Sequence, residues 1–340
     1  MFSWQKLPEK TCVLLGEPLA STGEMKDSPA HIIPSALGGR LKPKGFLSSR
    51  ANNLLAQRVD TPFVDAFGQS LTYLAKIKRD RNKGTSTRLT AADKKSWRVS
   101  FEKSAIEPAK PDIDVTVLND KSQSIEFSGT EEQFRQFLKS KNLEQHADKL
   151  IPAAIKISEP SPELQLGMKP INAGHCSLAA WTSAALFAAH KLQIQVPAWV
   201  DYINGASGDT TLAPCVRFAP GALRIEEDFG TIAHGVALWD VPERQQLFGY
   251  LQSFGGMGMI VCLTEQWTSP VRCSYFVDPT TGKQGEPGFQ IQSGAQSFAY
   301  MTDASVKQDF TDTINRISKC IEETGIGKTR IVVQEEQSDP

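Results

Sequence analysis

Four apolar runs between residues 231 and 279 constrain the fold more than any other part of the sequence. They read TIAHGVALWDV, QLFGYLQSF, GMGMIVCLTE and CSYFVDP, and only short links separate them. A parallel pair of strands needs a crossover of about a dozen or more residues, whereas an antiparallel pair can be joined by a short turn. These runs therefore predict an antiparallel meander.

The segment before the meander, CSLAAWTSAALFAAHKL (176–192), is apolar almost all round. A helix of this kind is buried on most sides, so the sequence predicts an α+β fold. A second helix is expected from Thr61, as N-cap, and Pro62 to Gly84. Other elements are expected from local patterns: strands at 11–17, 96–103, 112–118 and 124–129, and a helix opened by the capping box that starts at Thr130.

The best boundary between domains is EPSPELQLGMKP (159–170), which is rich in proline. We expect four segments. They are an N-terminal module (1–84), a basic connector with strands and a helix (85–160), a larger C-terminal α+β domain (161–333) and a disordered polar tail (334–340).

Composition narrows the class of protein. The 340 residues are 40% hydrophobic and 22% charged, as in globular proteins, and no apolar run reaches the length of a membrane span. The six cysteines form no C-x-x-C pair and no secretory signal is visible, so a cytoplasmic protein with reduced thiols is expected. Residues 38–110 hold 16 Lys and Arg against 6 Asp and Glu, which favours either a surface that binds a polyanion or a solvated basic face.

One short motif carries chemistry. HIIPSALGGR (31–40) is followed by SSRANN (48–53) and by Val59-Asp60. In this order and spacing the residues resemble the HNH endonucleases of the ββα-metal fold, in the subfamily with a Glu-His-Ile-Ile-Pro motif and two C-x-x-C pairs. The resemblance covers about 70 residues. More weakly, the strand-rich region at 234–282 resembles the region that follows such modules in long members of the subfamily.

The resemblance implies a fold and a set of roles. A β-hairpin within residues 10–78 should carry His31 and pack on a helix bearing Asn52 or Asp60. His31 would be the general base, because an imidazole with a pKa of about 6.5 can accept a proton from water at neutral pH. Asn52 would orient the base, or Asn53 if the register differs by one residue. Asp60 would be a ligand of Mg²⁺ or another divalent cation.

The departures from the family pattern matter equally. Ala30 occupies a ligand position where family members carry an acid, and Glu24 or Asp27 could substitute for it. Of the four zinc cysteines only Cys12 remains. The other three positions are Leu15, Ser48 and Ala51. Structural zinc needs four ligands, so no structural zinc is expected and packing of Leu14, Leu15, Phe46 and Leu47 should replace it.

DNA is the expected partner, through phosphate contacts that do not read sequence. The candidate contacts are Arg40, Lys42, Lys44, Arg50, Lys76, Lys78, Arg79 and Arg81. No membrane partner is expected. The C-terminal domain should act as a sensor, bind a protein partner or form a homo-oligomer. The resemblance also implies bacterial defence against foreign DNA.

Two other interpretations stay open at this stage. A non-catalytic DNA-binding protein could retain the HNH scaffold, and Ala30 is the main reason to consider it. A cysteine hydrolase in the C-terminal domain could use Cys176 as nucleophile, His234 as base and Asp240 as the third member. In the first interpretation His31 keeps no catalytic role, and in the second the chemistry lies outside the N-terminal module.

Overall fold

The computed structural model describes most of the N-terminal segment and of the C-terminal half, and the backbone of the elements between them. The described residues are 2–65, 77, 86–91, 96–100, 105–108, 112–119, 122–128, 131–142, 164–165, 172–205, 215–292, 311, 315 and 319. Contacts divide the chain into two compact units. Unit 1 joins Met1–Lys83 to Met168–Pro340, and unit 2 is Gly84–Gly167. The expected N-terminal module and C-terminal domain therefore belong to one unit, and unit 2 is inserted between them.

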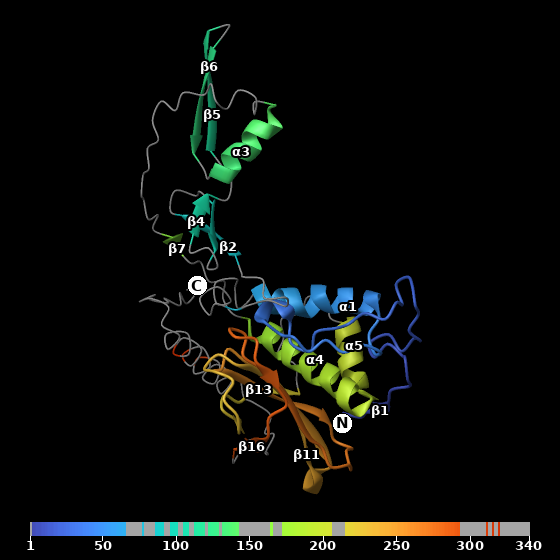
Figure 1. The fold of residues 1–340 in the computed structure, drawn as a ribbon. Coiled ribbons are helices and arrows are strands. Elements are labelled where there is room, and N and C mark those ends of the chain that lie inside the picture. Colours follow the sequence, from blue (N-terminus) through green and yellow to red (C-terminus); the bar gives the residue numbers. More distant parts are fainter. Residues whose placement is uncertain are drawn as a thin grey trace, which may run out of the picture. The chain divides into compact units, whose positions relative to one another are not determined.

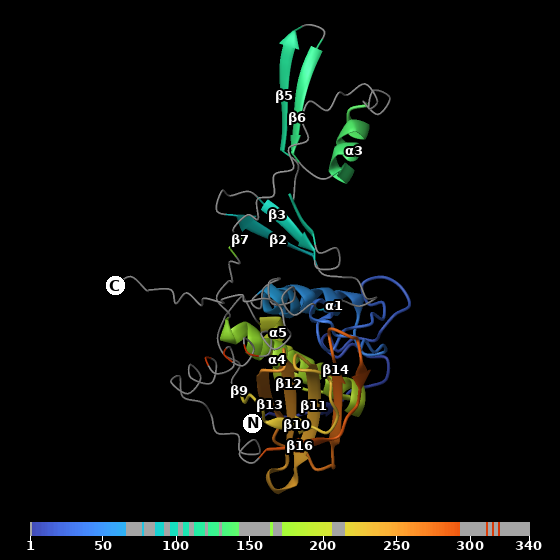
Figure 2. The same cartoon turned by 60° about the vertical axis from the view of Figure 1, so that its left-hand side comes forward.

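A six-stranded antiparallel sheet is the largest sheet described in unit 1, and helix α4 (Ala173–Leu192) lies between it and the N-terminal segment (Figures 1 and 2). Its order is β15-β14-β11-β12-β13-β9. The strands are β9 (Val216–Phe218), β11 (His234–Val241), β12 (Gln246–Ser253), β13 (Met257–Thr264), β14 (Arg272–Val277) and β15 (Gln284–Gly285). The predicted α+β class with an antiparallel meander is confirmed. One detail differs, because β14 returns to pair with β11 while β9 occupies the free edge of β13.

Helix α4 (Ala173–Leu192) lies across one face of this sheet and contacts β11, β12 and β13 (Figure 1). The side chain of Asn172 caps its first turn by accepting a hydrogen bond from the backbone N–H of His175, at 3.1 Å. Every residue from Cys176 to Ala189 is buried, as the apolar sequence predicted. The helix approaches the sheet closely at Gly249, where a Cβ would stand 2.4 Å from that of Ala184.

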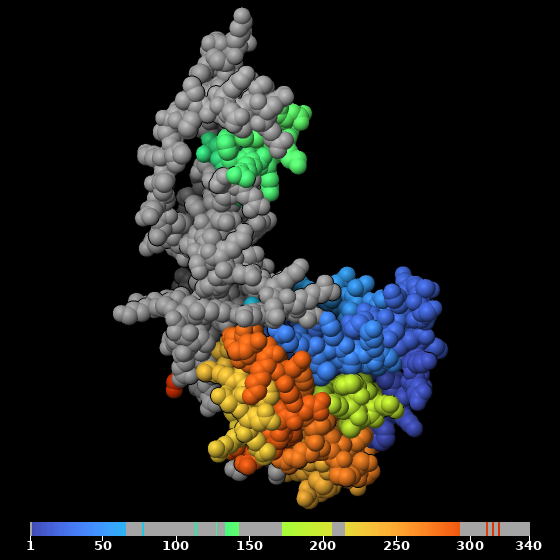
Figure 3. All heavy atoms as spheres, viewed as in Figure 1, coloured from blue at the N-terminus to red at the C-terminus, as the bar shows by residue number. Residues whose placement is uncertain are grey.

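Shorter elements complete unit 1. They are β1 (Gln5–Lys6) paired with β8 (Ile194–Gln195), β10 (Leu223–Ile225) paired with β16 (Phe289–Ile291), α5 (Pro197–Gly205), and the 3₁₀ turns η1 (Ser35–Leu37) and η5 (Pro242–Arg244). In the space-filling view the N-terminal segment lies directly against the C-terminal strands (Figure 3). The predicted strand at 11–17 is absent from this described stretch, where Thr11 and Pro18 form only an isolated bridge.

Unit 2 holds the strands and the helix that the local patterns predicted. One sheet has the order β4-β3-β2-β7, and a separate hairpin pairs β5 with β6. The elements are β2 (Ser86–Ala91), β3 (Ser96–Ser100), β4 (Ala105–Pro108), β5 (Asp112–Asn119), β6 (Ser122–Ser128), β7 (Leu164–Gln165) and α3 (Glu131–Ser140). The ring of Phe127 on β6 packs against those of Phe134 and Phe137 on α3, and these contacts hold helix to hairpin.

The N-terminal segment pairs two extended stretches before its helix. Backbone bonds run from Ser28 N–H to Leu47 and from Ile32 N–H to Leu41, at 2.9 and 3.0 Å. Among the described residues of these two stretches, the pairing forms no regular strands and contains one isolated β-bridge, between Asp27 and Ser48. The arrangement resembles an irregular hairpin, and the expected ββα module stays a prediction.

The helix after this hairpin starts earlier than the sequence predicted. It is capped by Ser48, runs through α1 (Ser49–Leu55), continues as the π-helical turn η2 (Ala56–Asp60) and remains helical to residue 65. Thr61 is therefore a helical residue with φ −63° and not an N-cap. Pro62 cannot donate to the helix ladder, and a π-helical turn just before it relieves that mismatch. Of the predicted remainder of this helix, to Gly84, only Ile77 is described, and it is buried but not helical, so the prediction is wrong at that residue. The other positions lie outside the described residues.

The Gly38-Gly39 pair is required by close packing. Gly38 has φ +85° and ends η1, and a Cβ there would stand 2.7 Å from Cβ of Pro279. At Gly39 a Cβ would stand 1.9 Å from the carbonyl oxygen of Ile33. These contacts hold the loop after His31 in one conformation against the turn that follows β14.

We expect Gly39→Ala to lower the free energy of unfolding by about 1–3 kcal/mol or more, because the methyl group collides with fixed backbone. Gly45→Ala is the matched control, since its φ of +90° is left-handed but no atom lies within 4 Å of the added Cβ. It should cost only about 1–2 kcal/mol. Urea unfolding of both variants measures the difference, and a larger loss in Gly45→Ala than in Gly39→Ala would contradict the packing explanation.

No helix in the described part of the chain is long and apolar enough to cross a membrane.

Candidate functional site

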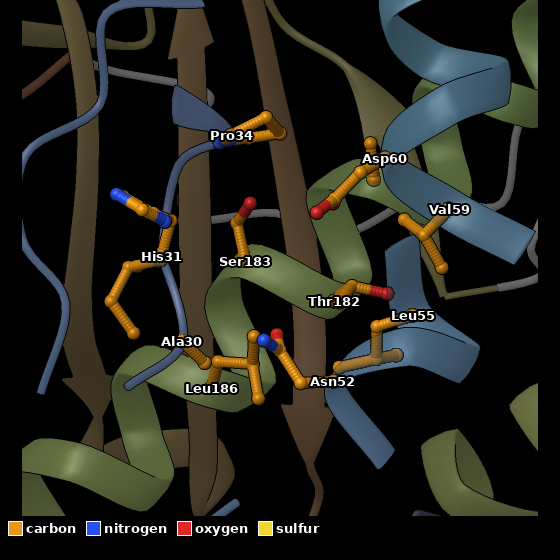
Figure 4. Close-up of a pocket in the computed structure, with 12 residues that line it drawn as sticks. Ala30, His31, Pro34, Asn52, Leu55, Val59, Asp60, Thr182, Ser183 and Leu186 are labelled. Atoms are coloured by element: carbon orange, nitrogen blue, oxygen red, sulfur yellow. The ribbon is translucent and has the colours of Figure 1, made fainter. Parts of the chain in front are cut away.

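One small pocket brings together the residues that the HNH-like motif singled out (Figure 4). His31, Asn52, Asp60 and Ala30 all line it, although they are spread over 31 positions of the chain. The rest of the lining is Ile32, Pro34, Leu55, Val59, Ala179, Thr182, Ser183 and Leu186. The cavity volume open to the centre of a water-sized sphere is about 10 Å³, which is the lower limit for one water molecule.

The backbone hydrogen bonds of the irregular hairpin, such as that from Ile32 N–H to Leu41, position His31. Ala30 and Ile32 on either side are 1% exposed, whereas His31 is half-buried at the pocket rim. In Figure 4 its imidazole extends away from Asp60. A shared role in which both side chains act on one group requires the histidine ring to turn toward the carboxyl.

Asn52 lies on α1 and connects the helix to the segment that carries His31. Its Nδ2 donates to Oγ of Ser28 at 3.2 Å. Asn53, the alternative in the motif, is exposed and does not line the pocket. The geometry therefore favours Asn52 over Asn53. The side chain of Asn52 is hydrogen-bonded to Ser28, three positions before His31.

Asp60 ends the π-helical turn and points into the pocket toward Ser183 (Figure 4). Burial raises the pKa of its carboxyl to about 7, because desolvation disfavours the charged form. No cationic side chain of the described residues forms an ion pair with it. A carboxyl held this way is half-protonated near neutral pH and lacks a described counter-charge.

Two pocket residues could not be found from the motif. Thr182 and Ser183 come from α4, more than 120 positions after Asp60, and each is 3% exposed. Trp199 Nε1 donates to Oγ1 of Thr182 at 3.1 Å. In sequence they are two hydroxyls in an apolar helix, and only the packing of α4 on the N-terminal segment shows where they lie.

The donor set can be compared with what a divalent cation needs. The pocket offers one carboxylate, one amide oxygen and two hydroxyls, and Mg²⁺ is commonly held by one or two carboxylates with water and substrate phosphate. No group of three His, Cys, Asp or Glu that could hold a metal occurs among the described residues. Asp60 fits as one ligand, and Ala30, elsewhere in the lining of the same pocket, supplies no second acid. Glu24 and Asp27, the possible substitutes, do not line the pocket, and Asp27 Oδ1 accepts from Gly45 N–H at 2.9 Å.

The structure also brings together three positions where family members carry zinc cysteines. Cys12 Sγ lies 3.5 Å from Ser48 Oγ, and that hydroxyl accepts from Ala51 N–H at 3.2 Å. All three residues are fully buried, at 0% exposure. Leu14, Phe46 and Leu47 are buried as expected, whereas Leu15 is only half-buried. A thiol, a hydroxyl and a methyl group thus meet where the resemblance would place a zinc site.

We expect the triple variant Leu15→Cys, Ser48→Cys, Ala51→Cys to bind one zinc per chain, because three thiolates would then meet at positions 12, 48 and 51 and the motif places the fourth at position 15. The parent chain should bind none. Elemental analysis after purification with zinc measures both, and the double variant without Leu15→Cys is the control. Stoichiometric zinc in the parent would show that other side chains serve as ligands, and none in the triple variant would show that these positions do not form a zinc site.

The predicted DNA contacts divide into three groups. Lys42, Lys44 and Arg50 are exposed. Arg40 is half-buried. A Cβ added at Gly282 would stand 2.4 Å from its guanidinium, so Arg40 packs against the turn after β14. The other four candidates, Lys76, Lys78, Arg79 and Arg81, lie outside the described residues.

The cysteine hydrolase is not supported. Burial raises the pKa of Cys176 far above its ordinary value and lowers that of His234 to about 3, so neither a thiolate nor an imidazolium forms readily. Asp240 is six residues from His234 along β11, about 20 Å away, and its Oδ1 accepts from Val271 N–H at 2.8 Å. Asp278 is the acid beside His234, since Val277 pairs with His234 across β14.

Comparison with known proteins identifies no relative. The chain matches no family model, no curated protein and no solved structure.

Proposed function

We propose that the pocket of His31, Asn52 and Asp60 is an HNH-type site that hydrolyses DNA phosphodiester bonds with a divalent cation. The observation that carries the proposal is that these three residues, and Ala30 at the expected ligand position, line a single pocket. Residues so far apart in sequence share a pocket only if the segment folds to bring them together. The meeting of Cys12, Ser48 and Ala51 supports the same ββα arrangement independently.

The roles follow from the chemistry of the side chains. His31 accepts a proton from the attacking water, after its ring turns toward the pocket. Asn52 positions His31 through Ser28. Asp60 would hold Mg²⁺ or another divalent cation, which when bound supplies counter-charge for the scissile phosphate and the leaving oxygen. With Ala30 in place of an acid, we expect this chain to hold the ion weakly and to cleave slowly.

The wider setting is part of the proposal. The exposed Lys42, Lys44 and Arg50 would bind DNA phosphates without reading sequence. The large sheet would serve as a sensor, or bind a protein partner or a second copy of the chain. A cytoplasmic location and a role in defence against foreign DNA complete this proposal. The first rests on the scattered cysteines, and the second on the resemblance of the motif.

A second candidate is a DNA-binding protein that retains the scaffold without cleavage. Two observations favour this candidate. The His31 ring points away from Asp60 and would have to turn before it could act as a base. Ala30, which is 1% exposed, leaves the expected ligand position apolar. In this candidate the basic residues keep their role and His31 has none.

Nicking of supercoiled plasmid over a titration of Mg²⁺ and Mn²⁺ separates the two. The nuclease proposal predicts slow, metal-dependent nicking that falls at least tenfold in His31→Ala, because general-base catalysis contributes about 10²–10⁴-fold. The matched control is His175→Ala, which removes a half-buried histidine outside the pocket and should leave the nicking rate unchanged. The second candidate is selected if the parent and His31→Ala both bind DNA without nicking it, and if this binding weakens strongly between about 50 and 200 mM salt.

A further inference from the structure

A larger pocket lies where helix α4 ends, and it shares no residue with the His31 pocket. Its volume open to the centres of water-sized spheres is about 270 Å³, close to the lower range of small-molecule sites at about 300 Å³. Its lining residues come from three separate stretches of unit 1: Leu7, Pro8, Glu9, Lys10, Lys44, Gly45, Phe46, Ala189, His190 and Gln193.

The wall of this pocket combines apolar side chains with two rings. Leu7, Phe46 and Ala189 are each at most 6% exposed. The rings of Phe46 and His190 lie 6.4 Å apart between centroids, with 29° between their planes. Nearly parallel rings at a pocket wall favour a flat, apolar group of a ligand.

The rim of the pocket is cationic. Lys10 and Lys44 are exposed, and neither forms an ion pair with any residue that the structure describes. Glu9 is the one acid in the lining. Two ammonium groups without a described counter-ion are suited to an anion such as a phosphate.

His190 adds a group whose charge depends on pH. It is half-buried, and its ring lies against that of Phe46. Burial lowers its pKa first, the neighbouring charge of Lys191 lowers it further, and Glu286 raises it. A bound anion would stabilise the protonated ring, so binding should tighten as the pH falls.

We propose that this pocket binds a 5′-mononucleotide, with its phosphate between Lys10 and Lys44 and its base against Phe46 and His190. The nucleotide is either free or the 5′-phosphorylated end of a DNA strand, and the chemistry recognised is the same. The inference does not depend on the nuclease proposal, because the two pockets share no residue and this one needs no metal. Lys44 alone belongs also to the predicted DNA contacts.

Calorimetric titration of the full chain in EDTA tests this proposal with dAMP, deoxyadenosine and inorganic phosphate. We expect dAMP to bind at least tenfold more tightly than either part alone. Lys10→Ala and Lys44→Ala should each weaken binding about fivefold or more, whereas Lys6→Ala, which alters an exposed lysine of β1 outside the lining, should change it less than twofold. Between pH 8 and pH 6 binding of dAMP should tighten in the parent but not in His190→Gln.

Two further arms identify the source of the nucleotide. A short oligonucleotide with a 5′-phosphate should bind more tightly than its 5′-hydroxyl form if a strand end is the ligand, and more weakly than dAMP if the free nucleotide is. The proposal is overturned if dAMP does not bind at millimolar concentration, if phosphate alone binds as tightly, or if Lys6→Ala and Lys44→Ala have equal effects.

Discussion

Ala30→Glu should lower the free energy of unfolding by about 3–5 kcal/mol at pH 8 in EDTA, the usual cost of an uncompensated buried charge. Ala30 is 1% exposed and lines the same pocket as Asp60, whose own carboxyl already lacks a described counter-ion. A divalent cation held between the two carboxylates would offset that cost. Saturating Mn²⁺ should therefore restore about 2–3 kcal/mol, as expected at roughly a hundred times the dissociation constant.

Ala30→Gln is the matched control, because it adds the same volume without the charge. It should be destabilised in EDTA and should gain no more from Mn²⁺ than the parent does. The Ala30→Glu chain should also nick plasmid faster than the parent, and His31→Ala in that background should remove the gain. If Mn²⁺ stabilises the Glu and Gln variants equally, the pocket does not direct a second ligand toward a metal.

Asp60→Asn should stabilise the protein at pH 8 in the absence of metal, by on the order of 2–4 kcal/mol. The pKa of Asp60 is raised from 3.8 to about 7 by burial, so the folded state holds a proton that the unfolded state has released. The stability that this proton contributes is complete below pH 3.8 and is lost as the pH rises through about 7. Asparagine is neutral throughout and avoids the loss.

Urea unfolding of both chains from pH 4 to pH 8 measures this dependence. The two curves should differ least near pH 4, diverge between pH 4 and pH 7, and stay parallel above pH 7. Asp65→Asn, which changes an exposed carboxylate five residues after Asp60, is the control and should show no such divergence. Parallel curves for the parent and Asp60→Asn over the whole range would mean that Asp60 is ionised and solvated in the folded protein.

Features set by local pattern could be predicted from the sequence. The runs that became β11, β12 and β13 needed only apolar stretches and short links, and α4 needed only its apolar length. The predicted start of the helix after His31 was wrong, because Thr61 and Pro62 form a strong local start signal that the π-helical turn overrides. Local signals describe what a segment prefers, and here the longer helix is favoured by packing.

The candidate site was predictable only as far as the motif extended. The motif singled out His31, Asn52 and Asp60 as candidates by their order in the sequence, and the fold brings them to one pocket. The contribution of α4 was not predictable, since no sequence signal joins Ser183 to Asp60. For the same reason Asp278 was missed as the neighbour of His234. That contact depends on β14 pairing with β11, and the register of two strands cannot be predicted from the sequence of either strand alone.

Binding of Mn²⁺ to the parent chain and to Asp60→Asn, followed by electron paramagnetic resonance at pH 8, tests the central claim most directly. At this pH most Asp60 carboxyls are ionised, since their pKa is about 7. A metal site built on Asp60 predicts one weakly bound Mn²⁺ per parent chain, lost in Asp60→Asn and retained in Asp65→Asn. Equal binding by the parent and Asp60→Asn, or no bound Mn²⁺ in the parent at millimolar concentration, would contradict it.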